Sequence, residues 1–182
     1  MQFFTSDLHF SHKLMVEERG FTDADQMNTS IIQSINNVVR PDDDLFIIGD
    51  LSFTNFENTE KILLSMQGRK HLILGNHDNL KFIKKLSHHF IWIKDRYMLK
   101  VKDEDVNGGN QKLFLDHYPM LTWPEAHHRV WQVHGHCHNS LDSIYESTRI
   151  DCGYDVWRRP IAYEDIKRYM STRTYKVVDH HK

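Results

Sequence analysis

The chain has 182 residues, the length of one domain, and its hydrophobic content of 40% excludes intrinsic disorder as the main state. Its 23 basic and 25 acidic residues give a formal net charge of -2, which does not favour a general nucleic-acid coat or a membrane-surface binder. We therefore predict a single domain spanning residues 1–182.

Cysteine content and apolar patterning predict the compartment. Cys137 and Cys152 form no CxxC pair, and residues 1–10 have neither the basic nor the apolar region of a secretory signal. No run approaches the roughly 20 apolar residues that cross a bilayer. We expect a cytoplasmic protein with no membrane partner and no obligate protein partner.

Strands are predicted where short apolar runs are bounded by polar residues, at 3–4, 45–48, 72–74, 91–93, 113–115 and 130–133. Helices are predicted where apolar residues recur every three to four positions, at 23–40, 57–67, 79–87 and 161–170. The polar segment 102–111, with Gly108-Gly109, predicts a hairpin turn. The alternation of elements predicts a layered α/β domain that binds ligands at the carboxyl ends of its strands.

Polar clusters follow five of the predicted strands directly. They are Asp7-Leu8-His9, Gly49-Asp50, Gly75-Asn76-His77-Asp78, Asp116-His117 and Gly135-His136-Cys137-His138. Imidazole, carboxylate and amide oxygen bind borderline divalent ions, so the clusters predict a metal centre. One zinc ion needs only three or four ligands, so a larger set favours two ions. The seven candidate ligands are Asp7, His9, Asp50, Asn76, His117, His136 and His138.

The spacing within two of these clusters predicts how their side chains point. Asp7 and His9 are two residues apart, so in an extended segment both would point to the same side. His136 and His138 have the same relation, with Cys137 facing away. We expect His134 to end its strand rather than to bind metal.

The ordered motifs resemble those of the calcineurin-like metallophosphoesterase superfamily: D-x-H, G-D, G-N-H-D/E, a lone H, and G-H-x-H. Within it, the chain is similar to small bacterial and phage phosphoesterases that lack a cap domain. The resemblance covers nearly the whole chain. It implies an α/β fold in which a two-sheet β-sandwich is flanked by helices, with four layers in the order α/β/β/α.

The resemblance also implies how the ligands divide between two ions. One ion would be held by Asp7, His9, Asp50 and His138. The other would be held by Asp50, Asn76, His117 and His136, so that Asp50 bridges the two.

Catalytic roles are implied for Asn76, His77 and Asp78. A hydroxide between the ions would attack phosphorus, and the Asn76 amide would balance charge on the phosphoryl oxygens. His77, oriented by Asp78, would protonate the leaving oxygen. The segment 151–157 resembles the C-terminal signature of the relatives and would place Asp155 near the site.

Other histidines and one arginine are weaker candidates. His12 and Arg19 are predicted contacts for a substrate phosphate, with solvation at the surface as the alternative. The histidine pairs at 88–89, 127–128 and 180–181 are expected to be exposed.

We therefore predict a metal-dependent phosphoesterase that acts on a monoester or diester of a small phosphorylated substrate, such as a nucleotide. Mn, Fe, Zn and Ni all suit the ligand set. Leu51-Ser52-Phe53 follows Asp50 where phosphoprotein phosphatases of the superfamily carry Asp-Arg-Gly, so that activity is not expected. The alternative is a nuclease or cyclic-nucleotide phosphodiesterase. A scaffold without catalysis is disfavoured because the ligand set is whole.

Overall fold

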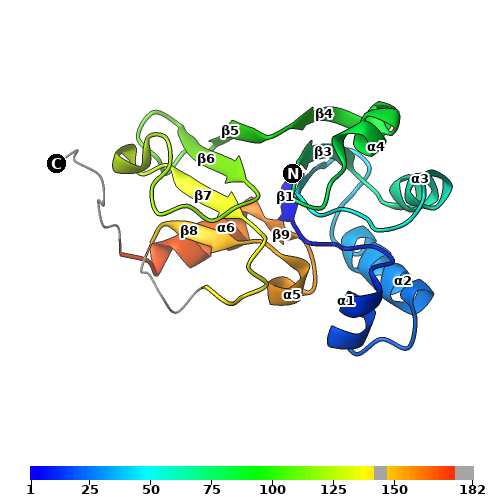
Figure 1. The fold of residues 1–182 in the computed structure, drawn as a ribbon. Coiled ribbons are helices and arrows are strands. Elements are labelled where there is room, and N and C mark those ends of the chain that lie inside the picture. The colour runs from blue at the N-terminus through cyan, green and yellow to red at the C-terminus, as the bar shows by residue number, and fades with distance from the viewer. Residues whose placement is uncertain (142–146, 175–182) are drawn as a thin grey trace.

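The first of two β-sheets carries most of the N-terminal half of the chain (Figure 1). The computed structural model describes residues 1–141 and 147–174, so the histidine pair at 180–181 lies outside the described residues. The first sheet has the order β4-β3-β2-β1-β9. Its strands are β1 (Gln2–Thr5), β2 (Asp44–Ile48), β3 (Arg69–Ile73), β4 (Phe90–Lys94) and β9 (Ile161–Ala162). β1 to β4 are parallel, and β9 pairs antiparallel with β1.

The second sheet has the order β5-β6-β7-β8. Its strands are β5 (Arg96–Lys102), β6 (Asn110–Asp116), β7 (Trp131–His134) and β8 (Arg149–Asp151). β5 and β6 form an antiparallel hairpin in which Lys102 pairs with Asn110, so the predicted turn is confirmed. β7 and β8 continue the sheet in parallel with β6. His134 ends β7, as expected.

Helices flank the two sheets. Between the strands of the first sheet run α1 (Lys13–Glu18), α2 (Ala24–Asn36), α3 (Phe56–Ser65), α4 (Leu80–Lys85) and the 3-10 helix η1 (Ser87–His89). In Figure 1, α1 to α4 lie on the side of the first sheet that faces away from β6, β7 and β8. The later helices are η2 (Ala126–His128), α5 (Tyr154–Trp157) and α6 (Tyr163–Ser171).

Alternate residues of the first sheet enter two different hydrophobic cores. On β1, Phe3 packs with the helices, whereas Phe4 packs in the core between the sheets. On β2, Ile47 and Ile48 divide in the same way. Burial of both faces explains why these strands read as continuous apolar runs. The predicted two-sheet α/β fold with flanking helices is confirmed.

The predicted helix at 161–170 begins too early. Ile161 pairs with Phe4 as part of β9, and the helix starts only at Tyr163. The Asp165 carboxylate accepts the N–H of Ala162 at 3.0 Å and closes the first turn. The pattern of apolar residues cannot separate a short strand from the helix that follows it.

The other boundaries also differ from the predictions. α2 ends at Asn36 rather than at 40, because Val38 and Val39 both donate to the Ile35 carbonyl in a tighter turn. The predicted helix at 79–87 is divided into α4 and η1. The analysis of apolar runs missed β5, β8, α1 and α5, which are polar or very short. Within residues 1–141 and 147–174, no helix is both long and apolar enough to span a bilayer.

Candidate metal centre

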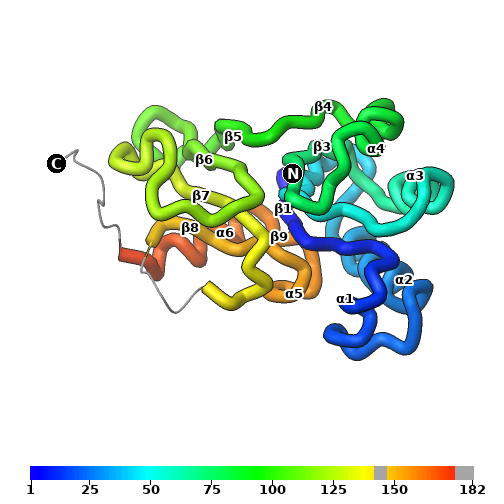
Figure 2. Tube along the Cα trace, viewed as in Figure 1, coloured from blue at the N-terminus to red at the C-terminus, as the bar shows by residue number. Residues whose placement is uncertain are grey.

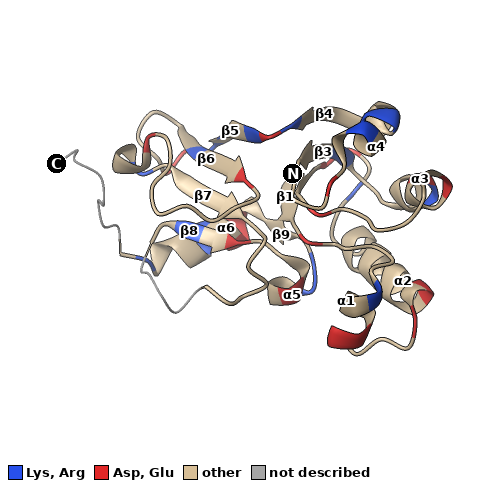
Figure 3. Cartoon of the chain, viewed as in Figure 1, with Lys and Arg blue, Asp and Glu red and all other residues tan. Residues whose placement is uncertain are grey.

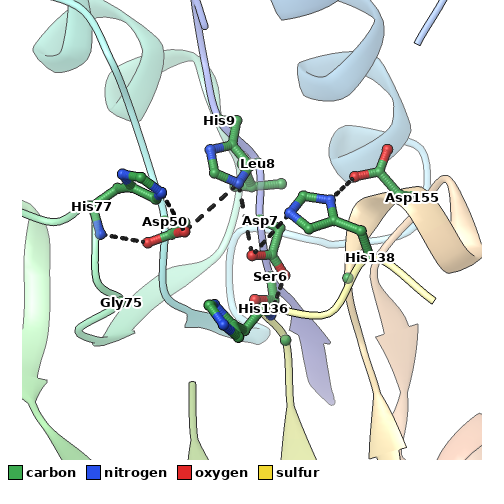
Figure 4. A network of polar contacts seen from close by, with 12 residues as sticks. Ser6, Asp7, Leu8, His9, Asp50, Gly75, His77, His136, His138 and Asp155 are labelled. Carbon is green, nitrogen blue, oxygen red and sulfur yellow. Dashed lines mark hydrogen bonds and ion pairs between the residues drawn. The ribbon is translucent and has the colours of Figure 1, made fainter. Parts of the chain in front are cut away.

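Loops that leave the carboxyl ends of β1, β2, β3, β6 and β7 meet at one edge of the two sheets. Figure 2 traces the segments after β1 and β7 into the same region, where the N–H of His136 donates to Asp7 Oδ2 at 2.9 Å. Figure 4 shows the cluster of side chains that results. The structure brings together all seven predicted ligands, Asp7, His9, Asp50, Asn76, His117, His136 and His138.

The first group of ligand atoms surrounds one position beside β1. Asp7 Oδ1 lies 3.7 Å from His9 Nε2 and 3.8 Å from His138 Nε2. Asp50 Oδ2 lies 3.7 Å from the same His9 nitrogen. Atoms that each lie about 2.1 Å from one ion are roughly 3.0–3.5 Å from each other, so this spacing is close to that of a coordination shell.

The second group is centred on an amide oxygen. Asn76 Oδ1 lies 3.0 Å from His117 Nε2 and 3.0 Å from His136 Nδ1. Asp50 Oδ2 lies 3.6 Å from His117 Nε2. Two imidazoles, an amide oxygen and a carboxylate oxygen therefore face one another.

The two oxygens of Asp50 have different surroundings. Oδ1 accepts the backbone N–H of His77 at 2.9 Å, which fixes the orientation of the carboxylate. Oδ2 faces both groups, at 3.7 Å from His9 Nε2 and 3.6 Å from His117 Nε2. The Asp50 side chain is only 2% exposed, so its orientation is held from all sides.

Unpaired buried atoms in the first group fit a cation. Asp7 Oδ1 and His9 Nε2 are buried and have no hydrogen-bond partner among the described residues. A buried polar atom without a partner costs about 1–3 kcal/mol, and an unpaired buried charge costs more. Burial alone would raise the pKa of Asp7, but the His9 side chain and the charge of His117 outweigh it and lower the pKa. The carboxylate is thus ready to bind a divalent ion.

The second group fits a cation for a different reason. His117 Nδ1 lies 2.8 Å from the carbonyl oxygen of Ile48, which can only accept, so Nδ1 carries the hydrogen. In the neutral ring, the lone pair of Nε2 then points at Asn76 Oδ1, which is also an acceptor. A cation shared between these two atoms resolves their repulsion.

Behind His138 lies a chain of charged groups that ends in the buried Arg19 side chain. His138 Nδ1 lies 2.6 Å from Asp155 Oδ2, which leaves Nε2 to face Asp7. The Asp155 carboxylate also accepts two bonds of 2.8 Å from the Arg19 guanidinium. Burial alone would raise the pKa of Asp155, but the bonds from His138 and Arg19 hold it well below its usual range. A carboxylate in this position orients a ligating imidazole.

The comparison with known sequences supports this chemistry. A sequence model of the family described as calcineurin-like phosphoesterase matches residues 3–181. The chain belongs to this family. At the level of the family, it is a metal-dependent hydrolase of phosphoester bonds.

Relatives of the calcineurin-like chain include phage proteins. The Gene 66 protein of Mycobacterium phage L5 is 28% identical, over 90% of each chain. The Gene 66 protein of Mycobacterium phage D29 is 26% identical, over 92% of this chain and 94% of the phage protein. A solved protein of unknown function from Aquifex aeolicus, AQ665, shares the fold with a TM-score of 0.71 and 24% identity, over 93% of this chain and 98% of that chain.

The structure corrects the expected role of Arg19. Its side chain is only 1% exposed, so it does not face a substrate at the surface. Besides Asp155, it donates to the backbone carbonyls of Leu8 at 2.9 Å and Asp7 at 2.6 Å. Arg19 therefore positions the first ligand loop and Asp155 from behind. This role depends on the contact with Asp155, which lies 136 residues away in the sequence, so the local sequence around Arg19 does not indicate it.

The expected contact between Asp78 and the His77 ring is also corrected. Asp78 Oδ2 accepts the N–H groups of Asp50 and Gly75 at 2.9 Å each, and Oδ1 accepts that of Leu51 at 3.0 Å. Burial raises the pKa of Asp78, although the hydrogen bond from Gly75 acts in the other direction. The carboxylate ties the second ligand loop to the third, so Asp78 acts on the backbone.

The ligand loops are not extended as the spacing suggested. Asp7, His9, Asp50, His136 and His138 all have positive φ values, of 54°, 49°, 55°, 70° and 45°. Left-handed backbone at non-glycine residues is uncommon and concentrates at functional sites. The ligands converge through these turns, so the reason given for their common direction was wrong.

Gly135 allows two ligand loops to approach closely. A Cβ atom at this position would overlap the Ser6 hydroxyl and the Asp7 carboxylate. Ser6 Oγ donates to the Ile48 carbonyl at 2.6 Å, so the crowded region also joins β1 to β2. A residue with a side chain therefore does not fit at position 135, before His136.

An exposed aromatic ring that the sequence analysis did not single out lies beside the first group. Phe53 is 38% exposed, and its ring centroid lies 5.0 Å from that of His77 and 4.0 Å from that of His12. The His77 side chain is 49% exposed, with Nε2 4.0 Å from Asp50 Oδ2. His12 Nδ1 accepts the N–H of Met15, and burial lowers the pKa of His12. A substrate contact through His12 stays a prediction.

A third set of ligand-like atoms lies apart from the centre. His88 Nε2 and His89 Nε2 lie 3.3 Å and 3.2 Å from Glu60 Oε1. The His89 side chain is only 12% exposed, so the expectation that both histidines are exposed is wrong for His89. Any count of bound metal has to separate this set from the main centre.

Proposed function

We propose that the chain is a phosphoesterase with two divalent ions that hydrolyses a small phosphorylated substrate. The position of Asp50 Oδ2 carries the proposal. It lies almost equally far from His9 Nε2 and His117 Nε2, at 3.7 Å and 3.6 Å, while the other oxygen is held by the backbone. One oxygen placed between two ligand groups is the position of a bridging ligand.

The proposed ligands follow the two groups of atoms. Asp7, His9 and His138 would hold one ion, and Asn76, His117 and His136 would hold the other, with Asp50 shared. Imidazole, carboxylate and amide oxygen suit Mn, Fe, Zn or Ni. When bound, the ions would neutralise charge at phosphorus and supply a nucleophile from water near neutral pH.

The protein's own groups would orient the substrate and move the proton. Asn76 turns its Oδ1 toward the two imidazoles, which leaves its amide N–H groups to donate to a phosphoryl oxygen. His77 is half exposed at the rim, and its backbone N–H is fixed on Asp50. A proton on His77 Nε2 would pass to the leaving oxygen. Asp78 would position this loop through the backbone rather than through the ring.

A nucleotide phosphodiester is a second candidate substrate. Two exposed aromatic residues flank the centre, Phe53 on the side of His77 and Tyr118 on the side of His136. Phe53 is 38% exposed and Tyr118 is 46% exposed. Rings of this kind stack on nucleobases, typically for about 1–3 kcal/mol per base. This observation favours an activity on nucleotides or short single strands.

A hydrolysis panel tests the proposal. An aryl phosphomonoester, an aryl phosphodiester and cyclic nucleotides are offered to the protein with each metal in turn. We expect metal-dependent turnover by the wild type and a loss of at least about a hundredfold in Asp50→Asn, because charge stabilisation at the reacting centre is lost. Asp42→Asn, an exposed carboxylate outside the site, is the matched control. Equal activity in Asp50→Asn and the wild type would contradict the assignment.

The number of ions is tested separately. Elemental analysis is performed on Glu60→Gln, which removes the carboxylate that faces His88 and His89 and so weakens the third set of ligand-like atoms. We expect two ions per chain in this variant and fewer in the double variant Glu60→Gln/Asp50→Asn. A single ion at saturation would refute the dinuclear centre.

A further inference from the structure

A cavity of about 380 Å³ lies beside His77 on the side of α4. His77 forms part of its wall, together with Asp78, Lys81, Phe82 and Lys85. The volume is at the lower end of the range for small-molecule sites, roughly 300–1,000 Å³, and fits a group such as a phosphorylated sugar or nucleoside. The cavity is therefore large enough for one side of a substrate.

The cavity is positively charged. Lys81 and Lys85 are both exposed on α4, and Figure 3 shows this helix as a concentration of basic residues. Among the described residues that line the cavity, Asp78 is the only acid. Its two oxygens already accept three backbone N–H groups, so it does not pair with the lysines. This concentration contrasts with the formal net charge of -2 for the whole chain.

The position of His77 connects the cavity with the reaction. Its Nε2 lies 4.0 Å from Asp50 Oδ2, on the border between the metal centre and the cavity. If His77 protonates the leaving oxygen, the rest of the leaving group extends past His77 and into this space. The side of the substrate that leaves would then meet Lys81 and Lys85.

We propose that this cavity binds the leaving group of the substrate, and that Lys81 and Lys85 select a leaving group that carries a phosphate of its own. The inference rests on the proposed phosphoesterase activity and adds a substrate class to it. The substrate has at least two phosphoryl groups, one at the metal centre and one in the cavity. A nucleoside bisphosphate, with one phosphate on each of two hydroxyl groups, and a terminally phosphorylated dinucleotide share this chemistry.

The expected preference for a phosphorylated leaving group can be estimated from the strength of exposed ion pairs. Each lysine contact with a phosphate at a solvated site is expected to change kcat/KM by about fivefold. Both together predict a preference of roughly tenfold to thirtyfold, which declines as salt screens the charges. Phe82 supplies an apolar wall for the part of the leaving group next to the phosphate.

The test compares substrates that differ only by a phosphate on the leaving group. Dithymidine monophosphate is offered without a terminal phosphate, with a 5′-phosphate and with a 3′-phosphate. 5′-AMP and adenosine 3′,5′-bisphosphate form a second arm, because attack on the 5′ phosphorus breaks the same kind of ester bond in both and releases neutral adenosine from the first and anionic 3′-AMP from the second. The arm with the larger preference shows whether the second phosphate belongs to a phosphodiester substrate or to a nucleoside bisphosphate.

Variants assign the preference to the two lysines. In Lys81→Met/Lys85→Met, the ratio of kcat/KM between phosphorylated and unphosphorylated substrates should fall toward one. Lys84→Met, on the same helix but outside the cavity wall, should keep the wild-type ratio. An unchanged ratio in the double variant, or equal losses in the double variant and in Lys84→Met, would overturn the inference.

Failure of the inference is distinguishable from failure of the proposed function. Turnover by the wild type with no preference for phosphorylated leaving groups in either arm overturns only the cavity's role. No metal-dependent turnover of any aryl ester, nucleotide or dinucleotide overturns the phosphoesterase proposal itself, and the inference with it.

Discussion

His138 Nδ1 and Asp155 Oδ2 lie 2.6 Å apart. Hydrogen bonding to Asp155 raises the pKa of His138, and the bond turns the opposite nitrogen of the ring toward Asp7. Arg19 completes the chain from the other side of the carboxylate. His138, a candidate ligand just after β7, is therefore oriented by Arg19 from the N-terminal part of the chain and by Asp155 from the C-terminal part.

Asp155→Asn is predicted to weaken binding of the ion beside His138 by about 10–100-fold, because a carboxylate behind a ligating imidazole raises its basicity and fixes its tautomer. Competition with a metal chelator measures the affinity. The control is Arg158→Gln, which removes an exposed ion pair of 3.6 Å with the same carboxylate. Wild-type affinity in Asp155→Asn would show that the contact does not act on the metal.

Arg19→Met should lower the free energy of unfolding by about 1–3 kcal/mol, because the Asp155 carboxylate, whose side chain is only 14% exposed, loses the two bonds of 2.8 Å from Arg19 and keeps only His138 and the exposed Arg158 as partners. Urea unfolding without substrate measures the loss. Arg19→Lys should recover only part of it, since an ammonium cannot bind the carboxylate through two parallel bonds. If Arg19 instead contacts substrate phosphate, KM rises in Arg19→Met while stability stays at the wild-type value.

Gly135→Ala is predicted to abolish metal binding, because the added methyl group forces Ser6 and Asp7 away from the centre. Elemental analysis after metal loading, in the Glu60→Gln background so that the third set of ligand-like atoms does not contribute, measures the loss. Gly108→Ala, in the turn between β5 and β6, is the control. The methyl group added at position 108 meets no atom within 4 Å, but the φ of +89° at this position makes alanine cost about 1 kcal/mol of stability. Retention of metal by Gly135→Ala would contradict the close approach of the two loops.

His77→Ala should slow hydrolysis of an alkyl phosphoester by about 10²–10⁴-fold, because a poor leaving group needs a proton. A nitrophenyl ester leaves without one, so its rate should fall far less. The rates of both esters at saturating metal provide the comparison. Equal losses on the two substrates would reject a role for His77 as general acid.

Asp44 links acid stability to the pairing of β2 with β3. Burial alone would raise the pKa of Asp44, but the bonds from His71 at 2.8 Å and from Arg69 lower it. In the unfolded chain the pKa of Asp44 is about 4, and in the folded protein it is lower. The contacts of the ionised Asp44 with His71 and Arg69 therefore stabilise the fold above about pH 4, and this contribution is lost as the pH falls through the folded pKa. The difference in unfolding free energy between wild type and Asp44→Asn should therefore shrink from pH 6 to pH 3.

The residue pattern predicted a layered α/β domain, the resemblance of its motifs to a known family implied the two sheets, and the seven candidate ligands lie together in the structure. The candidate ligands lie together because each motif comes just after an apolar run that forms a buried strand, as Gly49-Asp50 follows Ile48. Parallel strands bring their carboxyl ends to the same edge, so the order of motifs is enough to place them together. Identifying the ligands did not require knowledge of the turns that connect them.

Only the tertiary structure decided the roles of Arg19 and Asp78. Arg19 is buried against Asp155, and Asp78 holds backbone N–H groups instead of the His77 ring. The sequence also did not predict the left-handed turns at Asp7 and His138. Arg19 and Asp155 are 136 residues apart in the sequence, and Asp78 lies 28 residues from Asp50, so the spacing within each motif carries no information about these contacts. Residue type determines what a group can bind, whereas packing determines which neighbour it meets.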